Sequence, residues 1–336
     1  MSRREALLAG VSAASSLQRS FALRERLRAA PGAIDVTALI VGSSLQLQFR
    51  PLEKLLGACV SERGTVGVLV NSERPHALQR FTAAHELGHA CLDHQIMTDR
   101  SVGSWAAERT DFREVAADSF ASELLMPKWL IKMHAKRLGW NSQDLSSPSL
   151  AYQLALRLGV SFEAIRIGLL GQQLIPETAR HQLQTSTPKE LKLSLLQGTK
   201  LLDPWADAWQ LQTQDTGGHY SGGPNDLLVI DLQEPAASGY RWDLSAAEGC
   251  GFEVRSDEFS PSTSTTDATV GAPNTRRITF APPADSSEIL ELHLRRSWSG
   301  ELHPEAAFRI RFDSFGKERA GLSRYERIEM GLSAAA

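Results

Sequence analysis

The spacing of hydrophobic residues divides the first part of the chain into short strands and longer helices. Residues 45–49 alternate between apolar side chains and glutamine, which is the period of a half-buried strand, and the apolar run 67–70 predicts a second, more deeply buried strand. Between about 75 and 94 the apolar residues recur with helical spacing. A further helix is predicted from about 106 to 125. We expect it to end there because the residue before Pro127 disfavours helical dihedral angles.

The character of the chain changes after about residue 175. Gln, Thr, Ser and Pro dominate residues 176–188, which is typical of a linker, and Thr187 to Glu190 has the capping-box spacing that begins a short helix. From about residue 207 onward, alternating apolar stretches are separated by Gly, Pro, Ser and Asn, as in an antiparallel sandwich or barrel. The sequence therefore predicts two dissimilar domains, a mixed domain of helices and strands followed by an all-β domain.

Composition narrows the class of protein. The chain has 36 basic and 39 acidic residues, a formal net charge of −3, and 42% hydrophobic residues, which is typical of a globular protein and argues against a nucleic-acid coat. Three cysteines are too few for a disulfide framework. Arg3 and Arg4 resemble an export signal, but Glu5 interrupts it, so we expect an amphipathic helix there. Because no run of 18 apolar residues occurs either, we expect a cytoplasmic protein without a membrane span.

The strongest chemical signal is the sequence His85-Glu86-Leu87-Gly88-His89 within the first long predicted helix. Histidines four residues apart lie on one face of a helix, one turn above the other, so both imidazoles can reach the same metal ion. Glu86 lies beside them, where a carboxylate can take a proton from water. This pattern predicts a catalytic metal site in which the third ligand comes from another part of the chain.

The next predicted helix offers that third ligand. Glu114 follows His89 by 25 residues, and Asp118 lies one turn further along the same helix face. Glu114 would complete a His₂Glu set of the thermolysin type, with a fourth position left for water. Asp118 would accept the second ring N–H of a liganding histidine. The competing carboxylates are Glu108, Asp111 and Glu123, none of which has an aspartate four residues later.

These two helices carry a family resemblance. It rests on the run Arg80-Phe81-Thr82-Ala83-Ala84-His85-Glu86-Leu87-Gly88-His89, and then on Glu114, Ala117, Asp118, Phe120, Ala121 and the run Leu124-Leu125-Met126-Pro127. The combination closely resembles the ImmA/IrrE family of metallopeptidases and extends to about residue 175. The resemblance implies metal ligands at His85, His89 and Glu114, with Glu86 as general base. It also implies an intracellular endopeptidase of zincin-like α+β fold, followed by a small helical subdomain similar to a winged helix.

The donor set and the family resemblance also lead to expectations for the metal and the substrate. A His₂Glu set is typical of Zn²⁺, and Mn²⁺ stays an alternative because this donor set does not decide the identity of the metal. Several family members cleave a helix-turn-helix repressor, so we expect such a repressor as substrate and the derepression of stress, mobile-element or defence genes as the outcome. The alternative is a metal-containing regulator that binds DNA or protein without catalysis.

The predicted helical subdomain is rich in basic residues. Six of them lie between residues 128 and 166, against only Asp144 and Glu163. A basic helical module can contact nucleic-acid phosphates, so we keep DNA contact as a possible partner interaction. The simpler interpretation, a solvated face of the protein, is the one we favour.

The all-β domain carries a second resemblance. Residues 234–242, the run 271–274 and the turn that contains Trp298 occur in the order of the three binding loops of chagasin-type cysteine-protease inhibitors, which implies an immunoglobulin-like sandwich. The first two loops and the residue before Trp298 depart from the family pattern, so protease inhibition is not our expectation. Instead we expect Tyr240 and Trp298 to bind a protein partner, unless they are core residues, as we expect of Trp242.

These inferences divide the chain into five parts. They are a metallopeptidase core at 1–127, a helical subdomain at 128–180, a linker with a short helix at 181–206, a chagasin-like sandwich at 207–315 and a C-terminal tail at 316–336. Of the cysteines, Cys91 is expected to be a buried small hydrophobic residue, and Cys59 either a buried residue or a loop thiol near the metal.

Overall fold

The computed structural model describes most of the chain, with gaps. The described residues are 2–62, 65–92, 111–235, 239–260, 274–296, 298, 302–316, 318 and 326. Contacts between residues group the chain into two compact units: unit 1 comprises residues 1–136, 141–181 and 316–336, and unit 2 comprises residues 137–140 and 182–315. The second unit is therefore inserted between two parts of the first. No helix among the described residues is long and apolar enough to cross a membrane.

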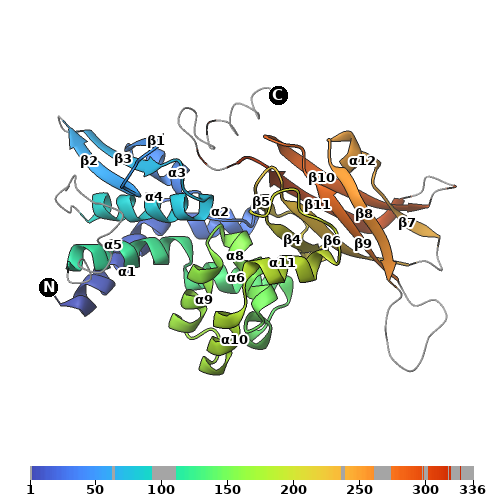
Figure 1. Cartoon of the computed structure of the whole chain (residues 1–336), viewed down its shortest axis with the longest axis horizontal. Helices are drawn as coiled ribbons and strands as arrows, with labels where there is room; N and C mark the ends of the chain where they lie inside the picture. The colour runs from blue at the N-terminus through green and yellow to red at the C-terminus, as the bar shows by residue number, and fades with distance from the viewer. Residues whose placement is uncertain are drawn as a thin grey trace. The chain divides into compact units, whose positions relative to one another are not determined.

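Unit 1 consists of helices and a small sheet that lies at one edge of the unit (Figure 1). Its elements are α1 (Arg3–Ser20), α2 (Leu23–Ala29), α3 (Val36–Gly42), β1 (Gln46–Arg50), β2 (Gly57–Glu62), β3 (Thr65–Asn71), α4 (His76–Cys91), α5 (Phe112–Leu125), α6 (Lys128–Leu138), α7 (Ser142–Leu145), α8 (Pro148–Leu158), α9 (Phe162–Gly171), a 3₁₀ turn (Glu177–Ala179) and α10 (Arg180–Thr185). The two predicted strands and both long helices are present, and the part of the second helix expected at 106–110 lies outside the described residues.

The sheet of unit 1 has the strand order β1-β3-β2. β1 pairs parallel with β3, while β2 pairs antiparallel with β3, from Gly57 opposite Val70 to Glu62 opposite Thr65. β2 was not predicted from the sequence. Helix α4 begins five residues after β3 ends and packs against both β2 and β3. β2 is therefore an edge strand that lies beside the helix carrying the histidine pair.

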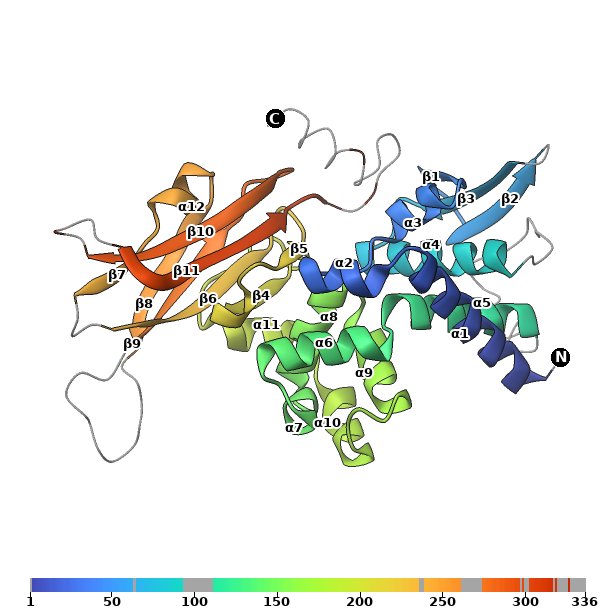
Figure 2. The ribbon, with the colours of Figure 1, turned by 180° about the vertical axis from the view of Figure 1, so that it is seen from behind.

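Small residues let the helices of unit 1 approach closely. α1 packs along α5, as Figure 2 shows from the opposite side. A Cβ atom added at Gly10 would lie 2.1 Å from the carbonyl oxygen of Ala116, so only glycine allows this approach. At Gly88 an added Cβ would lie 3.0 Å from the ring of Phe120, which brings α4 and α5 together in the same way. α4 is thus held between the sheet on one side and α5 on the other.

Residues 128–180, all of them described, form helices only. The strands that make the wing of a winged helix are absent from this segment, so the expected subdomain is reduced to its helical part. α8 and α9 are joined by a short turn whose first residue, Gly159, has φ +63°. Arg80 donates from Nε to the Gly159 carbonyl at 2.9 Å and from a terminal nitrogen to the Ile34 carbonyl at 2.7 Å. This arginine therefore ties α4 to the turn of the helical pair.

Unit 2 is a sandwich of two four-stranded sheets. Their strand orders are β5-β11-β10-β7 and β4-β6-β9-β8. The elements are α11 (Pro188–Leu196), β4 (Ala208–Gln212), a 3₁₀ turn (Thr213–Asp215), β5 (His219–Ser221), β6 (Leu227–Glu234), β7 (Tyr240–Asp243), α12 (Ser245–Gly249), β8 (Glu253–Ser260), β9 (Asn274–Ala281), β10 (Ser287–Arg296) and β11 (Leu302–Asp313). The predicted change to an all-β domain is confirmed, while an immunoglobulin-like arrangement of its strands stays a prediction.

Apolar and charged contacts join the two sheets. The indole of Trp209 in β4 packs edge-on against the ring of Phe312 in β11, with 5.5 Å between ring centroids. Arg276 in β9 makes a two-pronged contact with Asp257 (2.8 and 2.7 Å) and donates to the Trp242 carbonyl in β7 at 2.6 Å. Two parallel N–H···O bonds to one carboxylate are strong and directional. The buried guanidinium therefore fixes the edge strand β7 to the opposite sheet.

The short helix expected in the linker belongs to unit 2. α11 begins at a capping box in which Thr187 and Glu190 bond each other's backbone N–H, as the spacing predicts. Its last residue, Leu196, joins a buried cluster with Ala208 and Val229. Lys192 is buried and donates to the carbonyls of Pro204 (3.1 Å) and Ala206 (2.7 Å). These contacts hold the segment that leads into β4 against the helix.

Candidate metal centre

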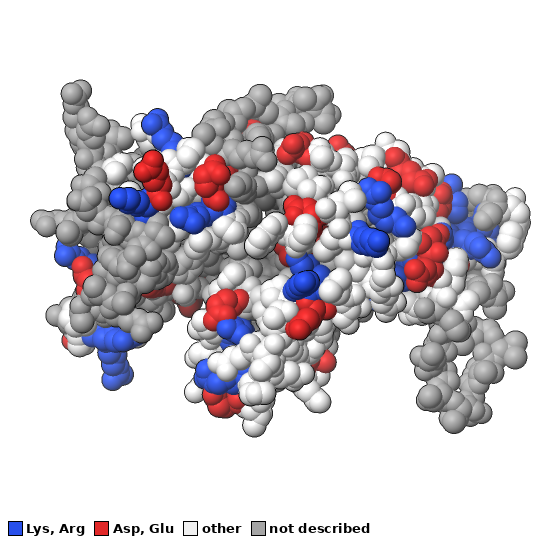
Figure 3. Space-filling view, viewed as in Figure 1, with Lys and Arg blue, Asp and Glu red and all other residues white. Residues whose placement is uncertain are grey.

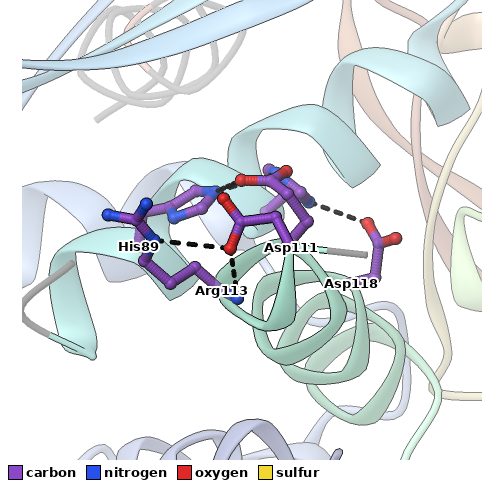
Figure 4. A network of polar contacts seen from close by, with 6 residues as sticks. His89, Asp111, Arg113 and Asp118 are labelled. Atoms are coloured by element: carbon purple, nitrogen blue, oxygen red, sulfur yellow. Dashed lines mark hydrogen bonds and ion pairs between the residues drawn. The ribbon is translucent and has the colours of Figure 1, made fainter. Parts of the chain in front are cut away.

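The histidine pair lies on the face of α4 that is turned towards α5. His85 and His89 are one helical turn apart, and their rings meet edge to face with 4.8 Å between centroids. The N-cap of α5 is Asp111, whose side chain accepts the Arg113 N–H at 2.9 Å (Figure 4). This cap fixes the start of the helix, so that Glu114 in its first turn faces the two imidazoles.

The donor atoms of the three residues converge on one point. The two Nε2 atoms of His85 and His89 are 3.0 Å apart, and each lies 3.3 Å from an oxygen of Glu114. One ligand atom from each residue lies within 4.8 Å of the others. Four ligands at about 2.0–2.1 Å from a tetrahedral metal ion are separated by roughly 3.3 Å. Two imidazole nitrogens and a carboxylate at these separations therefore fit a divalent metal ion.

Asp118 orients one of the imidazoles. Its Oδ1 lies 2.9 Å from Nδ1 of His85, as Figure 4 shows on the right of the close-up. A carboxylate at Nδ1 favours the tautomer in which Nδ1 carries the proton, which leaves the lone pair of Nε2 directed at the metal position. The structure thus brings together the expected ligands with the aspartate expected to support them.

Glu86 lies on a different face of α4. Its side chain is buried, with 6% of its surface exposed, and a Cβ atom added at Gly57 in β2 would lie 3.4 Å from Glu86 Cγ. The same added atom would lie 2.4 Å from Thr82 Cγ2, so glycine at position 57 lets β2 lie against the helix. Glu86 therefore stands between the histidine face and the edge strand. The missed strand β2 and its Gly57 are the parts of the site that sequence reasoning did not find.

The competing carboxylates occupy other positions. Asp111 serves as the N-cap of α5 and lies 3.4 Å from Nε of Arg113. Glu123 is more than two turns beyond Glu114 on α5, and burial raises the pKa of its carboxyl group. Glu108 lies outside the described residues. Of the carboxylates that the structure describes here, Glu114 is the one grouped with the histidine pair.

The cysteines differ from one another in exposure. Cys59 is buried within β2 and does not lie in a loop. Of the two expectations for this cysteine, the buried residue is confirmed. Burial, and after it the charge of Glu86, raises the pKa of the Cys59 thiol to about 11. Cys91, at the end of α4, is exposed, so the expectation of a buried residue there was wrong. The helix ends at this residue.

The two aromatic residues expected to bind a partner differ in exposure: Trp298 is exposed and Tyr240 is buried. Trp298 is 74% exposed, and its Cη2 would lie 1.9 Å from a Cβ atom at Gly239, which has φ +75°. The first and third loops therefore meet at one end of the sandwich, whereas the second, at 271–273, lies outside the described residues. Tyr240 is 8% exposed and lies under Arg296, 4.5 Å from ring centroid to guanidinium carbon. Trp242 is a core residue, as expected.

The basic residues of the helical part do not form one surface. Arg157 is 1% exposed and bonds Gln153, so it belongs to the interior. Arg166 on α9 pairs with Glu163, and the same helix exposes the apolar Ile167. Figure 3 shows basic and acidic side chains interspersed over this face of the helices. DNA contact stays a prediction.

Two packed helices thus share a three-residue donor set of metal-binding geometry, in a chain whose second unit is a sandwich. Two family models match parts of this chain. Residues 45–170 match peptidase family M78, the IrrE N-terminal-like domain, and residues 223–312 match the chagasin family of peptidase inhibitors, I42. The chain therefore carries an IrrE N-terminal-like domain and a chagasin-like domain, as the resemblances in the sequence implied.

Individual relatives cover parts of the chain. The radiation response metalloprotease IrrE of Deinococcus radiodurans is 31% identical over 146 residues, 42% of this chain and 42% of that protein. An uncharacterized immunity region protein 2 of Bacillus phage phi105 is 37% identical over 71 residues, 20% of this chain and 42% of that protein. The matched region thus spans less than half the length of each of these relatives.

Two solved structures are similar to about a third of the chain. The cysteine protease inhibitor EhICP2 of Entamoeba histolytica is 20% identical, with a TM-score of 0.28, and covers 33% of this chain and 99% of that one. The solution structure of Amebosin is 14% identical, with a TM-score of 0.26, and covers 31% of this chain and 95% of that one.

Proposed function

We propose that the protein is a metal-dependent endopeptidase whose centre is held by His85, His89 and Glu114. The observation that carries this proposal is the convergence of two Nε2 atoms and a carboxylate at 3.0–3.3 Å from one another. The match to the IrrE N-terminal-like domain supports it. Zn²⁺ suits this donor set, and Mn²⁺ is the alternative.

Each residue around the centre has a separate role in the proposed hydrolysis of a peptide bond. His85, His89 and Glu114 would hold a divalent ion, which would supply polarisation of the scissile carbonyl and a water nucleophile at neutral pH. Glu86 takes the proton from the attacking water and delivers it to the leaving amine. Asp118 holds His85 in the tautomer that binds metal, through the 2.9 Å contact at Nδ1. Among the described strands, β2 is an edge whose Gly57 lies beside Glu86, so an extended substrate can pair with it.

We further propose a helix-turn-helix repressor as the substrate, cut in the cytoplasm to derepress stress, mobile-element or defence genes. The relatives support this direction, since one is described as a radiation response metalloprotease and the other as an immunity region protein. The sandwich regulates the peptidase or binds a partner through the loop end that exposes Trp298. That domain adds no His, Cys, Asp and Glu cluster of metal-binding geometry among the residues described.

The ligand assignment is tested by two substitutions on one helix. Glu114→Ala should lower the metal content of the purified protein well below one ion per chain, because a carboxylate ligand is lost. Glu123→Ala, the same change on α5 but outside the donor set, is the matched control and should keep the metal. Metal analysis by mass spectrometry measures both. Full occupancy in Glu114→Ala would assign the third ligand to another carboxylate.

The substrate is tested by mixing. The protein is incubated with a helix-turn-helix repressor encoded beside it, with and without the repressor's DNA, and the products are resolved by mass. We expect a defined cleavage that a chelator abolishes. An intact repressor under all conditions would contradict the substrate proposal, while cleavage of another protein would leave the peptidase proposal standing.

A further inference from the structure

The segment that follows the sandwich along the chain belongs to unit 1. β11 ends at Asp313, and residues from Gly316 onward group with unit 1. Glu318 is 2% exposed there. A residue so close to a strand end and so deeply buried is held by specific contacts, since unpaired backbone groups are costly to bury.

The contact is made by one side chain of α4. Gln79 is 1% exposed, and its Oε1 accepts the backbone N–H of Glu318 at 2.9 Å. Its Nε2 donates to the backbone carbonyl of the same residue at 3.0 Å. This exchange of two bonds with a single residue is the one that paired residues make in an antiparallel ladder. The carboxamide of Gln79 thus bonds the backbone of Glu318 in the way that a residue of a neighbouring strand would.

Unit 1 holds this carboxamide in a fixed orientation. Nε2 of Gln79 also lies 3.1 Å from the carbonyl of Asn71 and 2.8 Å from that of Ser72, so the NH₂ end faces carbonyls and the oxygen faces the Glu318 N–H. Asn71 is itself fully buried, and its Nδ2 donates to the carbonyls of Leu52 and Leu55 at 2.7 and 2.8 Å. Backbone carbonyls of unit 1 therefore orient the carboxamide of Gln79 as well as Glu318 does.

We propose that Gln79 forms a docking site for an extended peptide backbone at the start of α4, and that its ligand is this chain's own residue 318. Both bonds use backbone atoms of Glu318, so the contact depends on its N–H and carbonyl groups. The segment that leaves the sandwich is thereby tied to the helix that carries His85 and His89. The site does not depend on the metal chemistry proposed above.

Trypsin cleavage of the full-length protein after Arg319 tests the docking. A protease cuts a folded segment when it opens, so the rate reports how often residue 318 leaves Gln79. Glu318→Pro removes the donated N–H and should speed the cut about tenfold, which corresponds to the loss of one to two hydrogen bonds. Glu318→Gln keeps the backbone and the side-chain size and is the matched control, expected to be cut at the wild-type rate.

A second substitution tests the receptor while leaving the cleavage sequence unchanged. Gln79→Met keeps the volume but removes both bonds to Glu318, together with those to the Asn71 and Ser72 carbonyls, and it should speed the cut at least as much as Glu318→Pro does. The double variant should be cut no faster than either single one, because both act on one contact. Thermal unfolding identifies any variant that fails to fold. A folded Gln79→Met protein cut at the wild-type rate, or rate effects that multiply in the double variant, would overturn the proposal.

Discussion

At the scale of single residues, the proposed metal site depends on which ring nitrogen of His85 faces Glu114 and His89. Asp118 lies at Nδ1, and more than half of its side-chain surface is exposed (55%). Asp118→Ala should weaken metal affinity by about 10- to 100-fold, as expected when the partner of a metal-binding histidine is removed. Asp118→Asn keeps an acceptor at that position and should lose less. A competition titration against a metal indicator measures both, and unchanged affinity in the alanine variant would deny Asp118 this role.

The cysteines give a second prediction at the same scale. The pKa of Cys59 is raised to about 11, and the thiolate is the reactive form. At pH 8, Cys91 and Cys250, both exposed, should react quickly with a thiol reagent, whereas Cys59 should react only after unfolding. Because the raised pKa favours the protonated folded state, the stability of the protein should fall between about pH 9 and 11, and less so in Cys59→Ser. Three fast thiols in the native protein would contradict this account.

At the scale of elements, the metal centre depends on how closely helices pack. An added Cβ at Gly10 meets the backbone of α5 at 2.1 and 2.8 Å, and a backbone cannot move aside as a flexible side chain can. Gly10→Ala should therefore cost about 1–3 kcal/mol of unfolding free energy. Gly171→Ala, where the added atom meets no described atom within 4 Å, is the matched control and should be neutral or slightly stabilising. Urea unfolding compares them, and equal stability would mean that α1 shifts freely on α5.

The same scale shows what the sequence could and could not predict. The histidine pair, Glu114 and Asp118 were found because helical spacing places residues three and four apart on one face. β2 was missed because its residues, 57–62, mix small and polar side chains without a clean alternation. The one signal of a turn in the sequence is Gly64, which lies between residues 57–62 and the apolar run 67–70. Gly57 carries no side chain for a pattern to detect, yet its contact with α4 places the edge strand.

At the scale of the whole molecule, parts that are distant along the chain belong to the same compact unit. The sequence predicts an appended sandwich at 207–315 and a tail at 316–336, because alternating apolar stretches begin after about 207 and the last of them ends at 312. The contacts instead return residues from 316 onward to unit 1, through a glutamine pairing that no periodicity encodes. Trp298 likewise needed the structure, since an aromatic residue near a strand end is equally typical of a core and of an exposed loop.

The most direct test of the central claim compares metal content and cleavage in the same sample of Glu86→Gln. This change keeps the size of a buried side chain and leaves His85, His89 and Glu114 in place, but an amide cannot take a proton from water. We predict full metal occupancy and cleavage lowered by at least about 100-fold relative to the wild type. A Glu86→Gln protein that holds its metal and cleaves at the wild-type rate would contradict the account.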